Sequence, residues 1–93
     1  MEENFNQLIK SAAIVLKHHG ARNVYLFGST AKNTMHKDSD IDMAVEGLPP
    51  EVFFKAMGEV HNILGRPLDL IDLDEQNPFT QYIKQEGKLM YVG

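Results

Sequence analysis

The sequence predicts an α/β (α+β) fold, in which helices flank one small sheet. Segments with helical periodicity alternate with short apolar runs along the chain, in the order helix, strand, helix, strand, helix, strand, helix. Glycine, proline and asparagine separate these segments, where helices and strands usually begin or end. Because strands that alternate with helices usually share a sheet, we expect residues 1–93 to form a single domain.

The first half of the chain is predicted to contain two helices and two strands. Apolar residues three and four apart predict an amphipathic helix over residues 4–19, which ends at Gly20. Residues 24–27 form a short apolar run of strand-forming residues, and a short helix is expected over residues 30–33. Residues 40–46 alternate between apolar and polar side chains, which predicts a strand with one buried face. The sequence leaves open whether the two strands pair parallel or antiparallel.

The second half is predicted to contain two helices, a third strand and a short edge strand. Residues 50–64 carry a broad apolar face between a proline pair and a glycine, which predicts a helix. An apolar run over residues 67–73 predicts a strand. Asn77 is a candidate N-cap for a helix over residues 78–86, and residues 88–92 are expected to add a short edge strand.

Composition argues against several functional classes. The net charge is −4, whereas nucleic-acid binding without sequence preference depends on a basic surface. The chain has no cysteine, which excludes disulfides, thiol catalysis and thiolate metal sites. No apolar run approaches the ~20 residues of a membrane span, and the acidic N-terminus is unlike a signal peptide. The cytoplasm is therefore the expected location.

A Gly-Ser pair precedes two aspartates that are spaced like neighbours on one strand face. Gly28 and Ser29 follow the first strand, and Asp40 and Asp42 come after a ten-residue spacer. Glycine lets the backbone approach a phosphate, and a helix N-terminus offers N–H groups to bind it. Two carboxylates on one strand face repel unless a cation lies between them, and Mg²⁺ prefers carboxylate and phosphate oxygens. The pattern therefore predicts a Mg²⁺–nucleotide site.

A third carboxylate interrupts the apolar strand at residues 67–73. Asp69 and Asp72 fall on opposite faces by strand alternation, so at most one joins the site. We choose Asp69, because Asp72 is nearer the strand end, where a solvated carboxylate costs little. Three carboxylates around one or two Mg²⁺ ions suit phosphoryl or nucleotidyl transfer, and Asp69 is the candidate acceptor for the proton of the attacking hydroxyl.

The combined motif resembles the polymerase-beta-type nucleotidyltransferase superfamily. It consists of Gly28-Ser29, ten residues, Asp40-x-Asp42, and Asp69 on a later strand. The small size resembles the minimal nucleotidyltransferase branch. The resemblance implies a polymerase-beta-like palm fold with a small mixed sheet, ATP as the donor, and two Mg²⁺ ions. It also implies that Asp40, Asp42 and Asp69 are the catalytic metal ligands.

The spacer departs from the pattern of this superfamily. Many members carry an arginine and a glycine just after Gly-Ser, where this chain has Thr30-Ala31-Lys32-Asn33. Lys32 supplies a positive charge but not the bidentate fork of arginine. The candidate nucleotide-binding residues are therefore Gly28, Ser29 and Lys32.

The resemblance also implies a protein partner. Members of the minimal branch often pair with a small helical HEPN-domain protein as an antitoxin–toxin module, and some attach AMP to the toxin and silence it. We therefore expect an enzyme that transfers AMP from ATP to a hydroxyl on such a partner. Two alternatives stay open: a non-catalytic antitoxin-like subunit with a vestigial nucleotide site, and nucleotidyl transfer to a small molecule.

Overall fold

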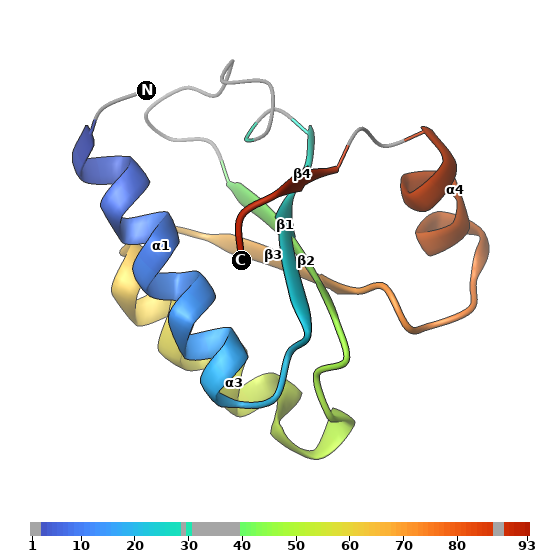
Figure 1. Ribbon diagram of the computed structural model, residues 1–93, viewed down its shortest axis with the longest axis horizontal. Coiled ribbons are helices and arrows are strands. Elements are labelled where there is room, and N and C mark those ends of the chain that lie inside the picture. The colour runs from blue at the N-terminus through green and yellow to red at the C-terminus, as the bar shows by residue number, and fades with distance from the viewer. Residues whose placement is uncertain (1–2, 29, 31–39, 87–88) are drawn as a thin grey trace.

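The computed structural model describes residues 3–28, 30, 40–86 and 89–93, and it confirms the predicted alternation of helices and strands (Figure 1). The bounds differ from those predicted by at most two residues. Of the short helix expected at residues 30–33, only Thr30 lies within the described residues, and it is helical. The elements are α1 (Glu3–His18), β1 (Asn23–Leu26), β2 (Ile41–Glu46), α3 (Pro50–Leu64), β3 (Leu68–Asp72), α4 (Pro78–Glu86) and β4 (Met90–Tyr91).

The four strands form one mixed sheet in the order β3-β2-β1-β4. β1 pairs antiparallel with both β2 and β4, whereas β2 pairs parallel with β3. The structure thus answers the question that the sequence left open, because the first two strands are antiparallel. The parallel pair needs a crossover connection, and α3 provides it.

The helices cover the two faces of the sheet unequally. Figure 1 shows α1 and α3 on one side of the sheet and α4 on the other. The larger core lies under α1 and α3, where Ile41, Met43 and Val45 of β2 are fully buried. On the opposite face, Ala44 packs in a smaller core with Ile83 of α4. We call these the α1/α3 face and the α4 face.

The ends of the helices follow the capping signals in the sequence. α3 ends at Gly65, which has the left-handed φ of 68°. The Asn77 side chain accepts a hydrogen bond from the Thr80 backbone N–H at 2.9 Å, which confirms the predicted N-cap of α4. None of the described helices combines the length and apolar character needed to cross a membrane.

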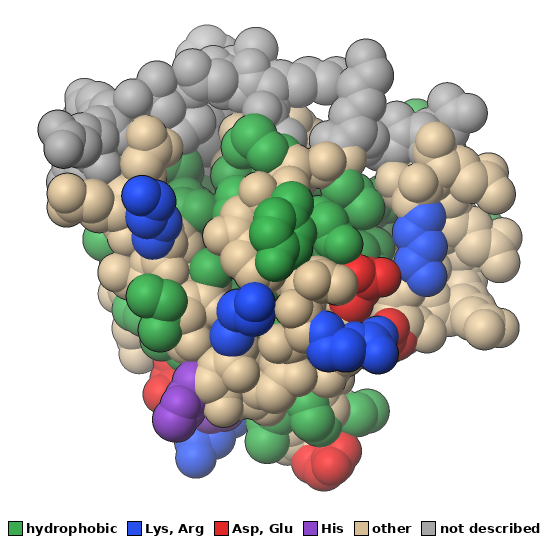
Figure 2. All heavy atoms as spheres, in the orientation of Figure 1, with side chains coloured by type: hydrophobic (Ala, Val, Ile, Leu, Met, Phe, Trp, Pro, Cys, Tyr) green, Lys and Arg blue, Asp and Glu red, His purple; other side chains and the backbone are tan. Residues whose placement is uncertain are grey.

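The β4 edge of the sheet is open to solvent. Figure 2 shows hydrophobic side chains gathered on the molecular surface around β4, between α1 and α4. Met90 and Tyr91 are both exposed, and the Tyr91 ring packs edge-on against Tyr25 with the centroids 5.7 Å apart. Both residues of β4 therefore present apolar surface at this edge of the sheet.

Candidate functional site

Two of the predicted site carboxylates are direct neighbours across the parallel strands. Asp42 of β2 and Asp69 of β3 are register partners, so their side chains project from the same face of the sheet. The following pair, Met43 and Leu70, is buried on the α1/α3 face, which leaves the two aspartates on the α4 face. Asp72 pairs instead with Val45, so it falls on the opposite face. The structure thus brings Asp69 to Asp42, and it does not bring Asp72 there.

Asp40 completes a group of three carboxylates that interact electrostatically. Asp40 lies directly before β2 and is exposed, as is Asp69 on β3. Asp42 is half-buried. Partial burial raises the pKa of Asp42, and the negative charges of Asp69 and Asp40 raise it further. A cation at this position would offset the repulsion between these carboxylates.

Gly28 places the predicted phosphate turn against the Asp42 carboxylate. β1 ends at Leu26, and Gly28 then adopts the left-handed φ of 61°. A Cβ atom at this position would lie 2.7 Å from Asp42 Oδ2, closer than real Cβ contacts allow. The left-handed turn therefore favours glycine, and a larger residue would also displace the Asp42 carboxylate. Ser29 and Lys32, the other two predicted phosphate contacts, lie outside the described residues.

Thr30 also contributes to the site, although the sequence did not predict it. Its side chain is almost fully buried, and its Oγ1 accepts a hydrogen bond from the Asp42 backbone N–H at 2.9 Å. Phe27 donates its own backbone N–H to the Asp42 carbonyl at 3.2 Å. The only signal in the sequence was a hydroxyl residue directly after Gly-Ser. The periodicity of the chain does not say that this hydroxyl faces a strand twelve residues later.

The donor chemistry of the group fits Mg²⁺, although the side chains do not form a complete ligand cage. Asp40, Asp42 and Asp69 offer only hard oxygen donors, which Mg²⁺ prefers. Within the described residues, no three Asp, Glu or His side chains are placed to hold one metal ion together. The strand register therefore brings the carboxylates to one region of the sheet, and their side chains would have to move closer together to bind one cation.

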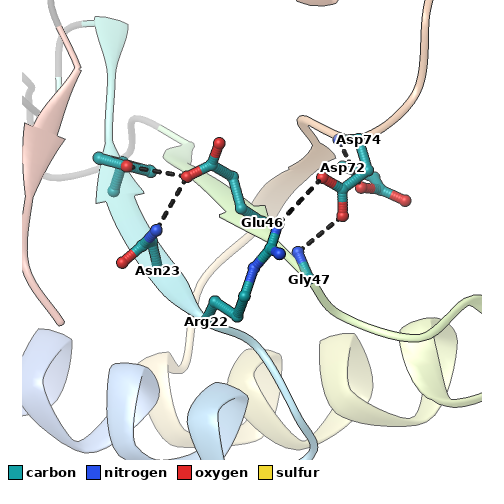
Figure 3. A network of polar contacts seen from close by, with 7 residues as sticks. Arg22, Asn23, Glu46, Gly47, Asp72 and Asp74 are labelled. Carbon is teal, nitrogen blue, oxygen red and sulfur yellow. Dashed lines mark hydrogen bonds and ion pairs between the residues drawn. The ribbon is translucent and has the colours of Figure 1, made fainter.

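Another carboxylate on the same face of β2 has a different environment. Glu46 accepts hydrogen bonds from Asn23 Nδ2 at 3.1 Å and from the Tyr25 hydroxyl at 2.9 Å (Figure 3). Next to it, Arg22 forms an ion pair with Asp74 at 3.8 Å. These contacts give Glu46 a structural role.

The chain also matches a known family over nearly its whole length. The family model described as Polymerase beta, Nucleotidyltransferase matches residues 9–92, which include the Gly28 turn and all three carboxylates. The chain belongs to this nucleotidyltransferase family. The match confirms the family and the polymerase-beta-like fold that the motif predicted.

Individual relatives agree with this assignment. The chain is 28% identical over 81 residues to a Methanocaldococcus jannaschii protein named "Putative protein adenylyltransferase MJ0435", with 84% of this chain and 87% of that protein covered. A solved chain from a structure named "Crystal structure of the toxin-antitoxin with AMP-PNP" is 26% identical, with a TM-score of 0.70 over 90% of this chain and 73% of that one. A structure named "Structure of putative minimal nucleotidyltransferase" shares the fold, with a TM-score of 0.73, 22% identity and 94% of each chain covered.

Proposed function

We propose that this chain, as one domain, transfers AMP from ATP to a hydroxyl group on a partner protein in a Mg²⁺-dependent reaction. The observation that carries the proposal is the register pairing of Asp42 with Asp69, beside Asp40 and against the Gly28 turn. Paired carboxylates next to a phosphate-binding turn are what nucleotidyl transfer needs, because the reacting groups are a triphosphate and its metal ions.

Each carboxylate has a proposed role in the reaction. Asp40, Asp42 and Asp69, the last on the strand beside Asp42, would hold two Mg²⁺ ions together with the triphosphate. When bound, Mg²⁺ lowers the pKa of the acceptor hydroxyl and stabilises the charge on the leaving oxygens. The hydroxyl oxygen forms a bond to the α-phosphorus, the bond to the β-phosphate oxygen breaks, and pyrophosphate leaves. Asp69 accepts the hydroxyl proton.

The turn after β1 is proposed to bind the phosphates. Gly28 gives the backbone the close approach that a phosphate needs, and Ser29 adds a hydroxyl donor. Lys32 adds a positive charge in the segment that follows.

The proposed acceptor is a small helical toxin of the HEPN type, which the modification silences. Two likenesses support this partner: the relative named as a protein adenylyltransferase and the solved toxin–antitoxin structure that was determined with AMP-PNP. The chain spans most of the adenylyltransferase relative, so its own fold accounts for the nucleotidyltransferase part of such a system. We place the pair in the cytoplasm.

A second candidate is a non-catalytic antitoxin that binds the same partner. The observation in its favour is that no three acidic or histidine side chains in the described part of the chain are placed to hold one metal ion. In that case the acids would be remnants of a nucleotide site, and contact alone would silence the toxin.

An ATP-labelling experiment with a matched control separates the two candidates. The protein is incubated with Mg²⁺, the product of the neighbouring gene, and ATP labelled either on the α- or on the γ-phosphate. We expect only the α-label to reach the partner. Asp42→Asn and Asp69→Asn should lower the transfer about 100-fold or more, because each removes a charge that the reaction uses. Asp72→Asn is the control, since Asp72 lies on the same strand but projects from the other face.

The two candidates predict opposite results for silencing. If wild-type protein silences the partner without any transfer of label, and Asp42→Asn silences it equally well, the enzymatic proposal is wrong and the binding subunit remains. Transfer of the γ-label instead would mean that the chain is a kinase.

A further inference from the structure

The backbone hydrogen bonding between β1 and β2 is replaced in part by a side-chain hydrogen bond at Asp42. The register that pairs Tyr25 with Ala44 brings Phe27 opposite Asp42 two residues further along. In an antiparallel pair of this kind, each residue donates to the carbonyl of the other. Phe27 makes its half of the exchange, because its N–H donates to the Asp42 carbonyl at 3.2 Å. The Asp42 N–H instead donates to the Thr30 side chain at 2.9 Å.

The change follows from the turn at Gly28. The left-handed φ of 61° at Gly28 directs the chain away from the ladder, so that a side chain from the following segment reaches the strand. Thr30 is only 1% exposed, so water does not compete for its hydroxyl.

Asp42 is thereby tied to the turn through its backbone, and its side chain lies close beside Gly28. Its N–H bonds to Thr30, and its Oδ2 lies where a Cβ on Gly28 would be only 2.7 Å away. These contacts join the two halves of the motif, although twelve positions separate Thr30 from Asp42 in the sequence. A shift of either half relative to the other would move the carboxylate away from the phosphate turn.

We infer that Thr30 is a positioning residue, whose hydroxyl fixes Asp42 against the phosphate turn and thereby sets the cation affinity of the site. The inference rests on the proposed function, because it assumes that Asp42 binds a cation beside a triphosphate. Thr30 itself need not touch metal or substrate. Its effect passes through the backbone of Asp42, in the way that outer partners of metal ligands tune affinity.

The test compares variants that differ in the hydroxyl. Thr30→Val keeps the shape and removes the acceptor, whereas Thr30→Ser keeps the hydroxyl. Thr30→Ala is made in parallel, so that a folded variant without the acceptor is at hand if the valine variant does not fold. Thr80→Val is the matched control, since Thr80 is an equally buried threonine on α4 whose hydroxyl donates to the Glu75 carbonyl at 2.6 Å.

Three measurements are made on each variant. Hydrogen exchange of the Asp42 amide, followed by NMR, reports the bond to Thr30 directly. Mn²⁺ titration followed by electron paramagnetic resonance reports cation affinity in the presence of ATP. The kcat and KM of AMP transfer to the partner report the reaction.

Loss of the hydroxyl should act on the site rather than on the whole fold. In Thr30→Val or Thr30→Ala we expect faster exchange of the Asp42 amide, and cation affinity and kcat each lower by about 10- to 100-fold. The KM for the partner should change little. Thr30→Ser should stay near wild type in all three measurements, and Thr80→Val should leave the Asp42 amide and the cation affinity unchanged.

Two results would overturn the inference. One is unchanged Asp42 exchange and Mn²⁺ affinity in the variants without the hydroxyl. The other is an equal loss of Mn²⁺ affinity in Thr80→Val, because the effect would then reflect stability alone. If wild-type protein transfers no AMP, the proposed function fails, but the exchange and Mn²⁺ measurements still decide the role of Thr30.

Discussion

The two ends of the α4 face of β2 carry carboxylates with opposite surroundings. Glu46 at one end accepts hydrogen bonds from Asn23 and Tyr25 (Figure 3). At the other end, partial burial raises the pKa of Asp42, and the charges of Asp69 and Asp40 raise it further. The same strand thus presents one carboxylate with two side-chain donors and one that is destabilised by its acidic neighbours.

The difference separates a structural acid from a functional one. A carboxylate that accepts good hydrogen bonds contributes to stability, because its donors would lose a partner without it. A carboxylate that is crowded by like charges costs stability, and such arrangements cluster at functional sites. Two carboxylates on the same face of one strand can therefore have different roles, and the groups around each carboxylate indicate which role it has.

Among the variants that test this comparison, Gly28→Ala should have the largest effect, and it changes only the functional end. The new Cβ would meet Asp42 Oδ2 at 2.7 Å, and the end of a side chain yields to such a contact by rotating away. We expect AMP transfer to fall about 100-fold, since misplacement by ~1 Å can cost that much. The measurement is kcat/KM with saturating Mg²⁺.

Gly65→Ala is the matched control for this prediction. Gly65 has nearly the same left-handed φ, 68°, but no atom lies within 4 Å of its added Cβ. Both variants should therefore lose about 1–2 kcal/mol in the free energy of unfolding from backbone strain, and only Gly28→Ala should lose activity. An equal loss of activity in both variants would show that strain, and not contact with Asp42, is responsible.

A smaller effect is expected from Glu46→Ala, which removes the carboxylate at the structural end of β2. The substitution leaves the Asn23 amide and the Tyr25 hydroxyl without their acceptor, so the free energy of unfolding should fall by about 1–3 kcal/mol. Activity should stay within about threefold of wild type, because the site carboxylates keep their places. Urea unfolding and label transfer check the two parts. Unchanged stability together with a large loss of activity would move Glu46 into the site.

The smallest effect is the pH dependence of Asp42→Asn in the absence of divalent ions. Because the folded pKa of Asp42 is raised above its ordinary 3.8, ionising this carboxyl disfavours the folded state. The asparagine variant should therefore be more stable than wild type above the folded pKa. Its advantage should shrink as the pH falls through that pKa and vanish below about 3.8.

Urea unfolding of both proteins, from about pH 7 down to about pH 3.5, measures this difference. A wild type that is the more stable of the two near neutral pH would contradict the assignment of Asp42 as the destabilised acid. When Mg²⁺ is added, it should stabilise the wild type more than the asparagine variant, because a ligand stabilises the folded protein that binds it.

The sequence predicted the elements well because the signals for them are local. The N-cap at Asn77, the glycine at position 65 and the alternation along β2 each depend on a few neighbouring residues. Strand alternation also put Asp69 and Asp72 on opposite faces, as the register with β2 has them.

The remaining features depend on contacts between distant segments. The antiparallel pairing of β1 with β2, the bond from Asp42 to Thr30 and the donors around Glu46 join residues more than ten positions apart. No periodicity in the chain encodes these contacts, because they arise only when the sheet forms. The roles of Ser29 and Lys32 stay predictions, since both lie outside the described residues.

The parallel pairing of β2 with β3 also bears on the order of folding. The whole of α3 separates Asp42 from Asp69, so the strands can meet only after a long loop has closed. Contacts of this kind are slow to form, because the entropy of closure is lost before they become favourable. We therefore expect the acidic pair to assemble late, so that a partly folded chain lacks a cation site and cannot yet act on a nucleotide.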